Sequence, residues 1–197
     1  PDRARRALDR LASVAPETRV STASDPMGER LVREAGFDPV RVVDPFEGDA
    51  PEPTETSADH TARVVRAFAG LERETGPGTD TADEDAGDAP VDLVVFVGGD
   101  GTATDVATAL EGTDVPMLGV PAGVKVYSSV FAVSPEDAAE VAATFSRTER
   151  REVMDIDEDA YREGEVHPEL RAVAAVPVAD DLQSSKQTAS GTVESLA

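Results

Sequence analysis

Hydrophobic and polar positions along the chain fall into stretches that fit helices and strands in turn. Residues 2–14 carry apolar side chains at helical spacing, and a second helix is expected between the Asp-Pro pair at 25–26 and Gly36. Short apolar runs at 18–23 and 39–44 flank that second helix and predict strands. This order of strand, helix and strand is typical of an α/β domain built on a parallel sheet.

The apolar run at 91–97 is the sharpest strand signal. It is nearly continuous and rich in valine, so it predicts a strand covered on both faces, as in a parallel sheet. A glycine-rich turn with the sequence GGDGT follows at 98–102, and helical spacing resumes at 104–110. We expect Thr102 to cap this helix, whose free N–H groups and dipole suit phosphate.

The remaining elements continue the pattern and then depart from it. Residues 116–120 predict a buried strand, and 124–132 predict the start of a helix or an ordered loop. Ser134 opens a capping-box sequence, SPED, which predicts a helix to about residue 146. Two further strands are expected, at 151–157 and 170–178, without a long helix between them.

This change of character predicts two domains. We expect an α/β nucleotide-binding domain over 1–148 and the beginning of an incomplete β-rich domain over 149–197. Residues 75–89 are acidic, glycine-rich and without apolar periodicity, and they predict a disordered surface loop. Since the first residue is proline, we expect the chain to be a segment of a longer protein.

The charge balance is extreme, with a formal net charge of −22 over 197 residues and only two lysines, Lys125 and Lys186. An acidic, lysine-poor surface is typical of proteins from a high-salt cytosol. It excludes a broad nucleic-acid-binding surface, and the absence of cysteine excludes disulfides and thiolate metal sites. No run is long enough to span a bilayer and no signal-peptide pattern is present, so we expect a soluble cytoplasmic protein. The sequence leaves open whether it forms a homo-oligomer.

The GGDGT turn carries the best candidate for chemistry, Asp100. Glycine-rich turns between a strand and a helix collect phosphate through backbone N–H groups, but this turn is neither a Walker loop nor a GxGxxG fingerprint. An acid would repel phosphate unless it orients or deprotonates an acceptor hydroxyl, or reaches phosphate through Mg²⁺. The simpler alternative, a tight hairpin turn, is disfavoured by the helical pattern that follows Thr102.

The wider sequence resembles a known kinase family. GGDGT is shared by NAD kinases, diacylglycerol-type lipid kinases and, more loosely, phosphofructokinases. The longer series GGDGTATDV, GVPAGVKVYSSVFA and REVMDID resembles the archaeal ATP-NAD/AcoX kinase branch over about residues 91–186. The resemblance implies a three-layer Rossmann-like α/β fold and, with the acidic composition, a haloarchaeal member. It also implies transfer from ATP, with Mg²⁺, to the 2′-hydroxyl of NAD.

The resemblance also implies roles for individual residues. Asp100 matches the acid that acts on the ribose 2′-hydroxyl. The implied nucleotide-binding residues lie in two loops: Gly98, Gly99, Gly101, Thr102 and Asp105 in the first, and Pro121, Ala122, Gly123, Lys125 and Ser128 in the second. No residue is assigned to a metal. Lys125 is one of two lysines in the chain, so an ammonium beside phosphate is one interpretation and a surface charge the other.

Departures from the family pattern keep alternatives open. The glycine-rich N-terminal motif and the Asn-Glu pair that typical NAD kinases use on the nicotinamide ribose are both missing. The acceptor can therefore be NAD, a lipid or another small alcohol, and the donor ATP or polyphosphate; a non-catalytic module that binds NAD or ATP is a further alternative. Gln183 and Lys186 resemble a polar stretch of the same branch, although a solvated loop is the simpler interpretation.

Two other patterns point to metal only weakly. Asp155, Asp157 and Asp159 begin like a calcium loop, but Ala160 and Val166 stand where such loops need glycine and glutamate. The two histidines of the chain are far apart in polar surroundings, and no metal-ligand spacing joins them.

Overall fold

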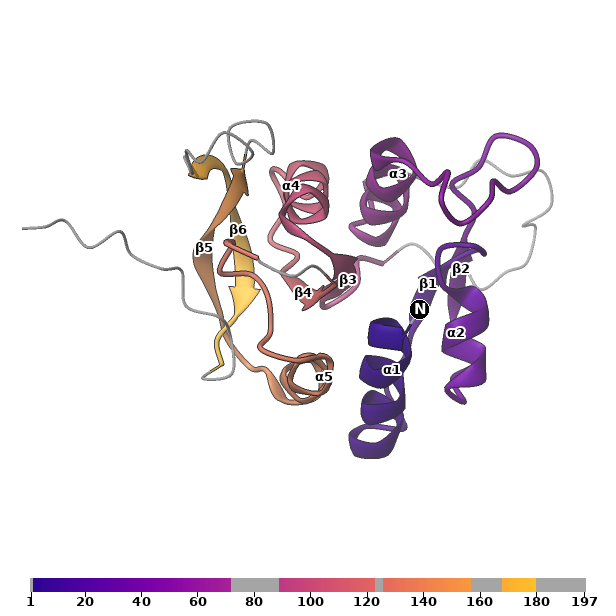
Figure 1. The fold of residues 1–197 in the computed structure, drawn as a ribbon. Helices are drawn as coiled ribbons and strands as arrows, with labels where there is room; N and C mark the ends of the chain where they lie inside the picture. Colours follow the sequence, from indigo (N-terminus) through magenta and orange to yellow (C-terminus); the bar gives the residue numbers. More distant parts are fainter. Residues whose placement is uncertain (1, 72–88, 123–125, 157–167, 180–197) are drawn as a thin grey trace, which may run out of the picture.

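The computed structural model describes residues 2–71, 89–122, 126–156 and 168–179, which form an α/β fold (Figure 1). The helices are α1 (Asp2–Val14), α2 (Glu29–Glu34), α3 (Ala58–Phe68), α4 (Asp100–Ala109) and α5 (Pro135–Thr144). The strands are β1 (Ser21–Ala23), β2 (Arg41–Val43), β3 (Val94–Gly98), β4 (Met117–Pro121), β5 (Thr148–Ile156) and β6 (Pro168–Pro177). The predicted disordered loop at 75–89 lies, apart from Ala89, outside the described residues.

The described strands pair two by two. β1 and β2 are parallel, and β3 and β4 are parallel with Val94 opposite Met117 and Gly98 opposite Pro121. Helices α3 and α4 lie on one side of β3 and β4, and α1 and α5 on the other (Figure 1). The prediction of a layered α/β domain with parallel strands is confirmed. β5 and β6 form an antiparallel pair that packs against α4.

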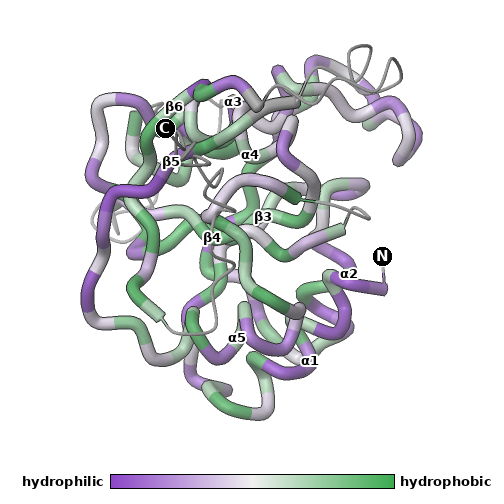
Figure 2. The backbone as a smooth tube through the Cα atoms, turned by 60° about the vertical axis from the view of Figure 1, so that its left-hand side comes forward, coloured by the Kyte–Doolittle hydropathy of each residue, from purple (hydrophilic) through white to green (hydrophobic). Residues whose placement is uncertain are grey.

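The main hydrophobic core is built around β4, which is buried at every position. Small and medium apolar side chains fill it from both sides, including Val106 of α4 and Phe131 from the loop after β4. Figure 2 shows the hydrophobic segments gathering around β3 and β4, with hydrophilic residues on the outer turns. Val153 of β5 and Val176 of β6 belong to this same core cluster. The division of the chain at residue 148 stays a prediction.

Two predicted elements differ from the structure in informative ways. The helix expected to begin at Asp25-Pro26 begins at Glu29, because Gly28 precedes it with φ +145°, a conformation that only glycine adopts easily. The segment 124–132, left open between helix and loop, is an ordered loop where residues 126–132 are described, with Phe131 bridging to Gly119 of β4.

β3 is not covered on both faces, so that prediction is wrong. Val94 and Phe96 are buried, whereas Val95 and Val97 are 47% and 41% exposed. The sheet that the described residues form here has two strands, so β3 lies at an edge. α1 and α5 pack on β4, and α4 covers the other face of β3. An apolar run alone does not say how many neighbours a strand has.

An ion pair between α1 and α5 makes stability depend on pH. Arg6 donates two hydrogen bonds to the carboxylate of Glu136, at 2.8 and 2.9 Å. These bonds, and the backbone N–H bond to the same carboxylate, hold the pKa of Glu136 below its ordinary value of 4.5. A lowered folded-state pKa gives stability that is present above pH 4.5 and is lost as the pH falls through the folded-state value.

We therefore expect Glu136→Gln to lower the urea midpoint at pH 7 by a small amount, since both side chains are largely exposed. The difference from the unsubstituted protein should shrink to nothing as the pH falls below 4.5. Urea unfolding of both proteins between pH 7 and the acid limit measures this. Glu111→Gln, at an exposed glutamate outside the α1–α5 contact, is the control. A constant difference across the pH range would contradict the prediction.

Candidate functional site

The site begins where β3 ends at Gly98 and α4 starts. Gly99 is the N-cap residue of α4, in an extended conformation, and Asp100 is the first residue of the helix. The prediction that Thr102 caps the helix is wrong, because the helix starts two residues earlier and places Thr102 within its first turn. Its side chain instead packs back on the strand end: a β-carbon on Gly98 would lie 2.4 Å from the Thr102 hydroxyl oxygen.

The structure therefore requires glycine at some of the three glycine positions of the turn and not at others. Gly98 is required by the close approach of Thr102. At Gly99 and Gly101 no atom of the described residues lies within 4 Å of the place where a β-carbon would stand, and neither glycine has a positive φ. Within the described part of the chain, neither packing nor backbone conformation requires glycine at these two positions, and close approach of a ligand to the first turn of α4 is a reason that remains. The free N–H groups of that turn suit an anion there.

The carboxylate of Asp100 joins α4 to the loop after β4. Its Oδ2 accepts the backbone N–H of Tyr127 at 2.9 Å, and its Oδ1 accepts the backbone N–H of Ser128 at 2.8 Å. A second contact joins the same two segments, since the N–H of Ala122 donates to the Gly98 carbonyl at 2.9 Å. The two sequence loops predicted to share one site thus lie side by side, at the ends of paired parallel strands.

The other predicted residues differ in where they lie. Pro121 is buried at the end of β4, Ala122 is exposed beside Gly98, and Asp105 is half-buried one turn into α4. Ser128 is only 1% exposed. Its hydroxyl donates to the carbonyl of Met154 in β5 at 2.9 Å and accepts the Met154 N–H at 3.0 Å.

Two residues predicted to bind the nucleotide, Gly123 and Lys125, lie outside the described residues. The same holds for residues considered for substrate or metal binding: Gln183, Lys186, His167, Asp157 and Asp159. His60 is explained by structure, because its Nδ1 accepts the Ser57 N–H in the capping box of α3. In the part of the chain that the structure describes, no three His, Cys, Asp or Glu side chains gather closely enough to hold a metal ion.

Sequence reasoning missed the backbone groups that hold Asp100. The N–H groups of Tyr127 and Ser128 carry no residue-specific signal, because every residue except proline has one. The link from Ser128 to Met154 was missed for a related reason, since its partners on β5 are also backbone atoms.

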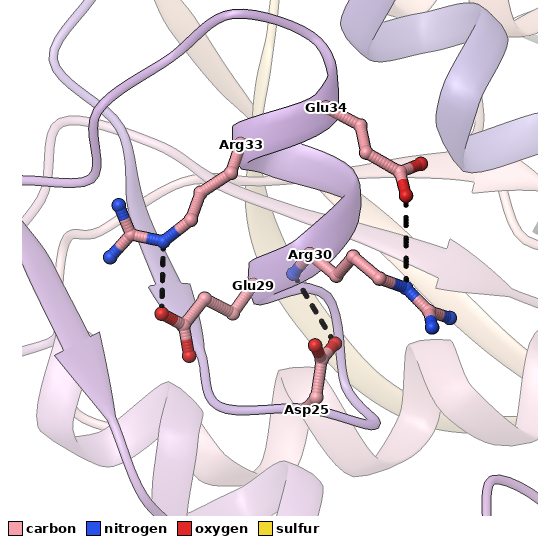
Figure 3. A pocket seen from close by; sticks show the side chains of 5 residues that line it. All are labelled: Asp25, Glu29, Arg30, Arg33 and Glu34. Atoms are coloured by element: carbon pink, nitrogen blue, oxygen red, sulfur yellow. Dashed lines mark hydrogen bonds and ion pairs between the residues drawn. The ribbon is translucent and has the colours of Figure 1, made fainter.

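Two depressions of the surface that the described residues form lie away from Asp100. One of about 480 Å³ is lined by charged residues at and before α2 (Figure 3). There Arg33 pairs with Glu29 at 3.0 Å and Arg30 with Glu34 at 3.9 Å, so the charges compensate one another. A second, of about 290 Å³, lies between the C-terminal end of α4 and β6. Neither is lined by a predicted site residue.

Comparison with known proteins gives one match. A family model described as the ATP-NAD kinase N-terminal domain matches residues 4–150. No curated protein and no solved structure matches the chain. The matched segment includes β3, α4, β4 and the loop that holds Asp100, and it ends within β5. No helix among the described residues combines the length and apolarity that crossing a membrane requires.

Proposed function

The chain belongs to the ATP-NAD kinase family, and from this we propose that it transfers the γ-phosphoryl group of ATP to the 2′-hydroxyl of NAD, giving NADP and ADP. Kinase chemistry is what the family indicates; the acceptor, the donor and the roles of individual residues are our proposal. The observation that carries it is the placement of Asp100, whose carboxylate is fixed by two backbone N–H groups beside the open first turn of α4.

The carboxylate of Asp100 can accept a further hydrogen bond, from a hydroxyl group of the acceptor. A carboxylate has about four lone-pair sites, and the amides of Tyr127 and Ser128 use one on each oxygen. The remaining sites can accept a hydrogen bond from the acceptor hydroxyl. Asp100 would then orient that hydroxyl and take its proton as the new O–P bond forms and the bond to ADP breaks.

The phosphates would lie against the first turn of α4. The free N–H groups and the positive end of the helix dipole favour an anion there, and the space beside Gly99 and Gly101 lets it approach the backbone. In a chain with a net charge of −22, such local positive groups are needed to hold ATP. Mg²⁺ enters this proposal as part of the substrate, Mg·ATP.

Incubation of the complete protein with Mg·ATP and NAD, followed by an NADP assay, tests the proposal. NADP formation at a rate proportional to enzyme supports it. ATP binding by calorimetry without NADP formation would overturn it in favour of a binding module. Phosphate transfer to glycerol or a diacylglycerol, but not to NAD, would overturn it in favour of another alcohol kinase.

Gly101→Ala separates ligand binding from folding. A methyl group at this position meets no atom of the described residues within 4 Å, and alanine is the better helix former by about 0.8–1 kcal/mol. We expect unchanged or slightly higher stability in urea unfolding, together with an ATP dissociation constant raised about tenfold or more by crowding of the phosphates. Stability should be measured without nucleotide and affinity by calorimetry. Unchanged ATP affinity would show that phosphate does not approach this turn.

A further inference from the structure

The loop after β4 stands between α4 and β5 and is bonded to both. On one side the backbone N–H of Ser128 donates to Asp100 at 2.8 Å. On the other side the Ser128 hydroxyl is bonded to Met154 through both its donor and its acceptor. One buried residue therefore connects the proposed site to β5.

The hydroxyl of Ser128 replaces a neighbouring strand at the edge of β5. A strand presents the N–H and C=O of alternate residues on each edge, and the Ser128 side chain satisfies both groups of Met154, at 3.0 and 2.9 Å. The other edge of β5 pairs with β6, and the register of that pair shifts between Val153 and Met154. The bond to Ser128 thus falls at the irregular point of the β5–β6 pair.

We propose that Ser128 is a positioning residue of the kinase site, acting on Asp100 through the loop that it anchors to β5. The inference rests on the proposed function, because it concerns the placement of the carboxylate that would orient the acceptor hydroxyl. The amides of Tyr127 and Ser128 hold that carboxylate, and these amides are only as fixed as the loop that carries them. Displacing a reacting group by about 1 Å costs about 10²-fold in rate, so a loosened loop should reduce turnover.

The neighbouring serine provides a matched control. Ser129 is also buried, at 6% exposure, but among the described residues its hydroxyl reaches only the Glu152 carbonyl, at 3.5 Å. Ser128→Ala removes two short bonds and leaves both backbone groups of Met154 unpaired, whereas Ser129→Ala removes one long contact. Each change deletes one hydroxyl oxygen, and the two positions are neighbours in the chain.

The experiment measures amide hydrogen exchange and kinetics in the complete protein. In Ser128→Ala we expect the amides of Tyr127 and Ser128 to exchange about tenfold faster than in the unsubstituted protein, after normalisation to the Val106 amide of α4. We expect kcat to fall about ten- to hundredfold with a much smaller change in the KM for ATP. Ser129→Ala should leave both readouts nearly unchanged. If Ser128→Ala does not fold, Ser128→Cys, which keeps the size but bonds weakly, should show the same changes to a smaller degree.

The outcomes separate this inference from the proposed function. Faster exchange confined to Met154, or a kcat no lower than that of Ser129→Ala, would overturn the positioning role. If the unsubstituted protein forms no NADP, the proposed function fails, while the exchange measurement still shows whether Ser128 fixes the amides that hold Asp100.

Discussion

Replacing Asp100 by asparagine should remove most phosphoryl transfer while the protein stays folded and binds ATP. A positioned acid–base group contributes about 10²–10⁴-fold to a rate, and we expect kcat to fall within that range. Asparagine has nearly the same shape but no carboxylate, so it cannot take the proton of the acceptor hydroxyl. ATP binding should persist, because the phosphates are proposed to contact the backbone of the first turn of α4 rather than this side chain.

The same substitution also disturbs the loop after β4, and this must be separated from the chemistry. An asparagine can accept one of the two N–H groups, from Tyr127 or Ser128, but its own NH₂ would face the other donor. Leaving one such group without a partner costs about 1–3 kcal/mol of stability. Asp100→Asn should therefore lower the urea midpoint as well as kcat.

Comparison with Ser128→Ala divides the two effects, because that variant loosens the loop but keeps the carboxylate. We expect a larger loss of kcat in Asp100→Asn than in Ser128→Ala, measured as NADP formation at saturating Mg·ATP and NAD. Glu111→Gln makes the same change in charge just beyond the far end of α4 and should leave kcat unchanged. If Asp100→Asn forms NADP at the same rate as the unsubstituted protein, the proposed role of Asp100 is wrong.

The existence and type of the elements could be predicted because their periodicity is local. Helices α1 and α4 and strands β1 to β4 follow from apolar spacing. Capping at Ser134 follows from the SPED sequence, and in the structure that side chain accepts the Asp137 N–H. The start of α4 could not be placed, because its N-cap is Gly99, which has no side chain to signal a cap. Helix ends set by backbone conformation alone carry a weak sequence signal.

The sequence was sufficient to predict which loops form the candidate site, but not which hydrogen bonds join them. Two successive parallel strands bring their carboxyl ends to one edge, so the turn after β3 and the loop after β4 had to lie together. The sequence could not show that backbone amides hold Asp100, nor that the Ser128 hydroxyl is bonded to β5. The exposure of Val95 could also not be predicted from the sequence, since it depends on which elements pack beside β3.

Gly119→Ala should strongly destabilise the core, because the fold leaves no room for one methyl group. A β-carbon at Gly119 would lie 2.3 Å from Cδ1 of Phe131 and 2.9 Å from Cζ of Phe96. These two rings already pack edge to face, with centroids 5.4 Å apart, and Phe131 is fully buried. The rings must move or β4 must shift, and overpacking of this kind costs about 1–3 kcal/mol or more.

Urea unfolding measures this loss, with Gly101→Ala as the control, because the added methyl group there lies within 4 Å of no residue that the structure describes. A second substitution tests the cause: Phe131→Leu alone should destabilise by opening a cavity, but in combination with Gly119→Ala it removes the ring that the new methyl group strikes. The two changes should then be coupled favourably by about 1 kcal/mol or more. Simple additivity of the two losses would mean that Gly119 is needed for a reason other than the ring, such as the bridge between Gly119 and Phe131 that holds the site loop against β4.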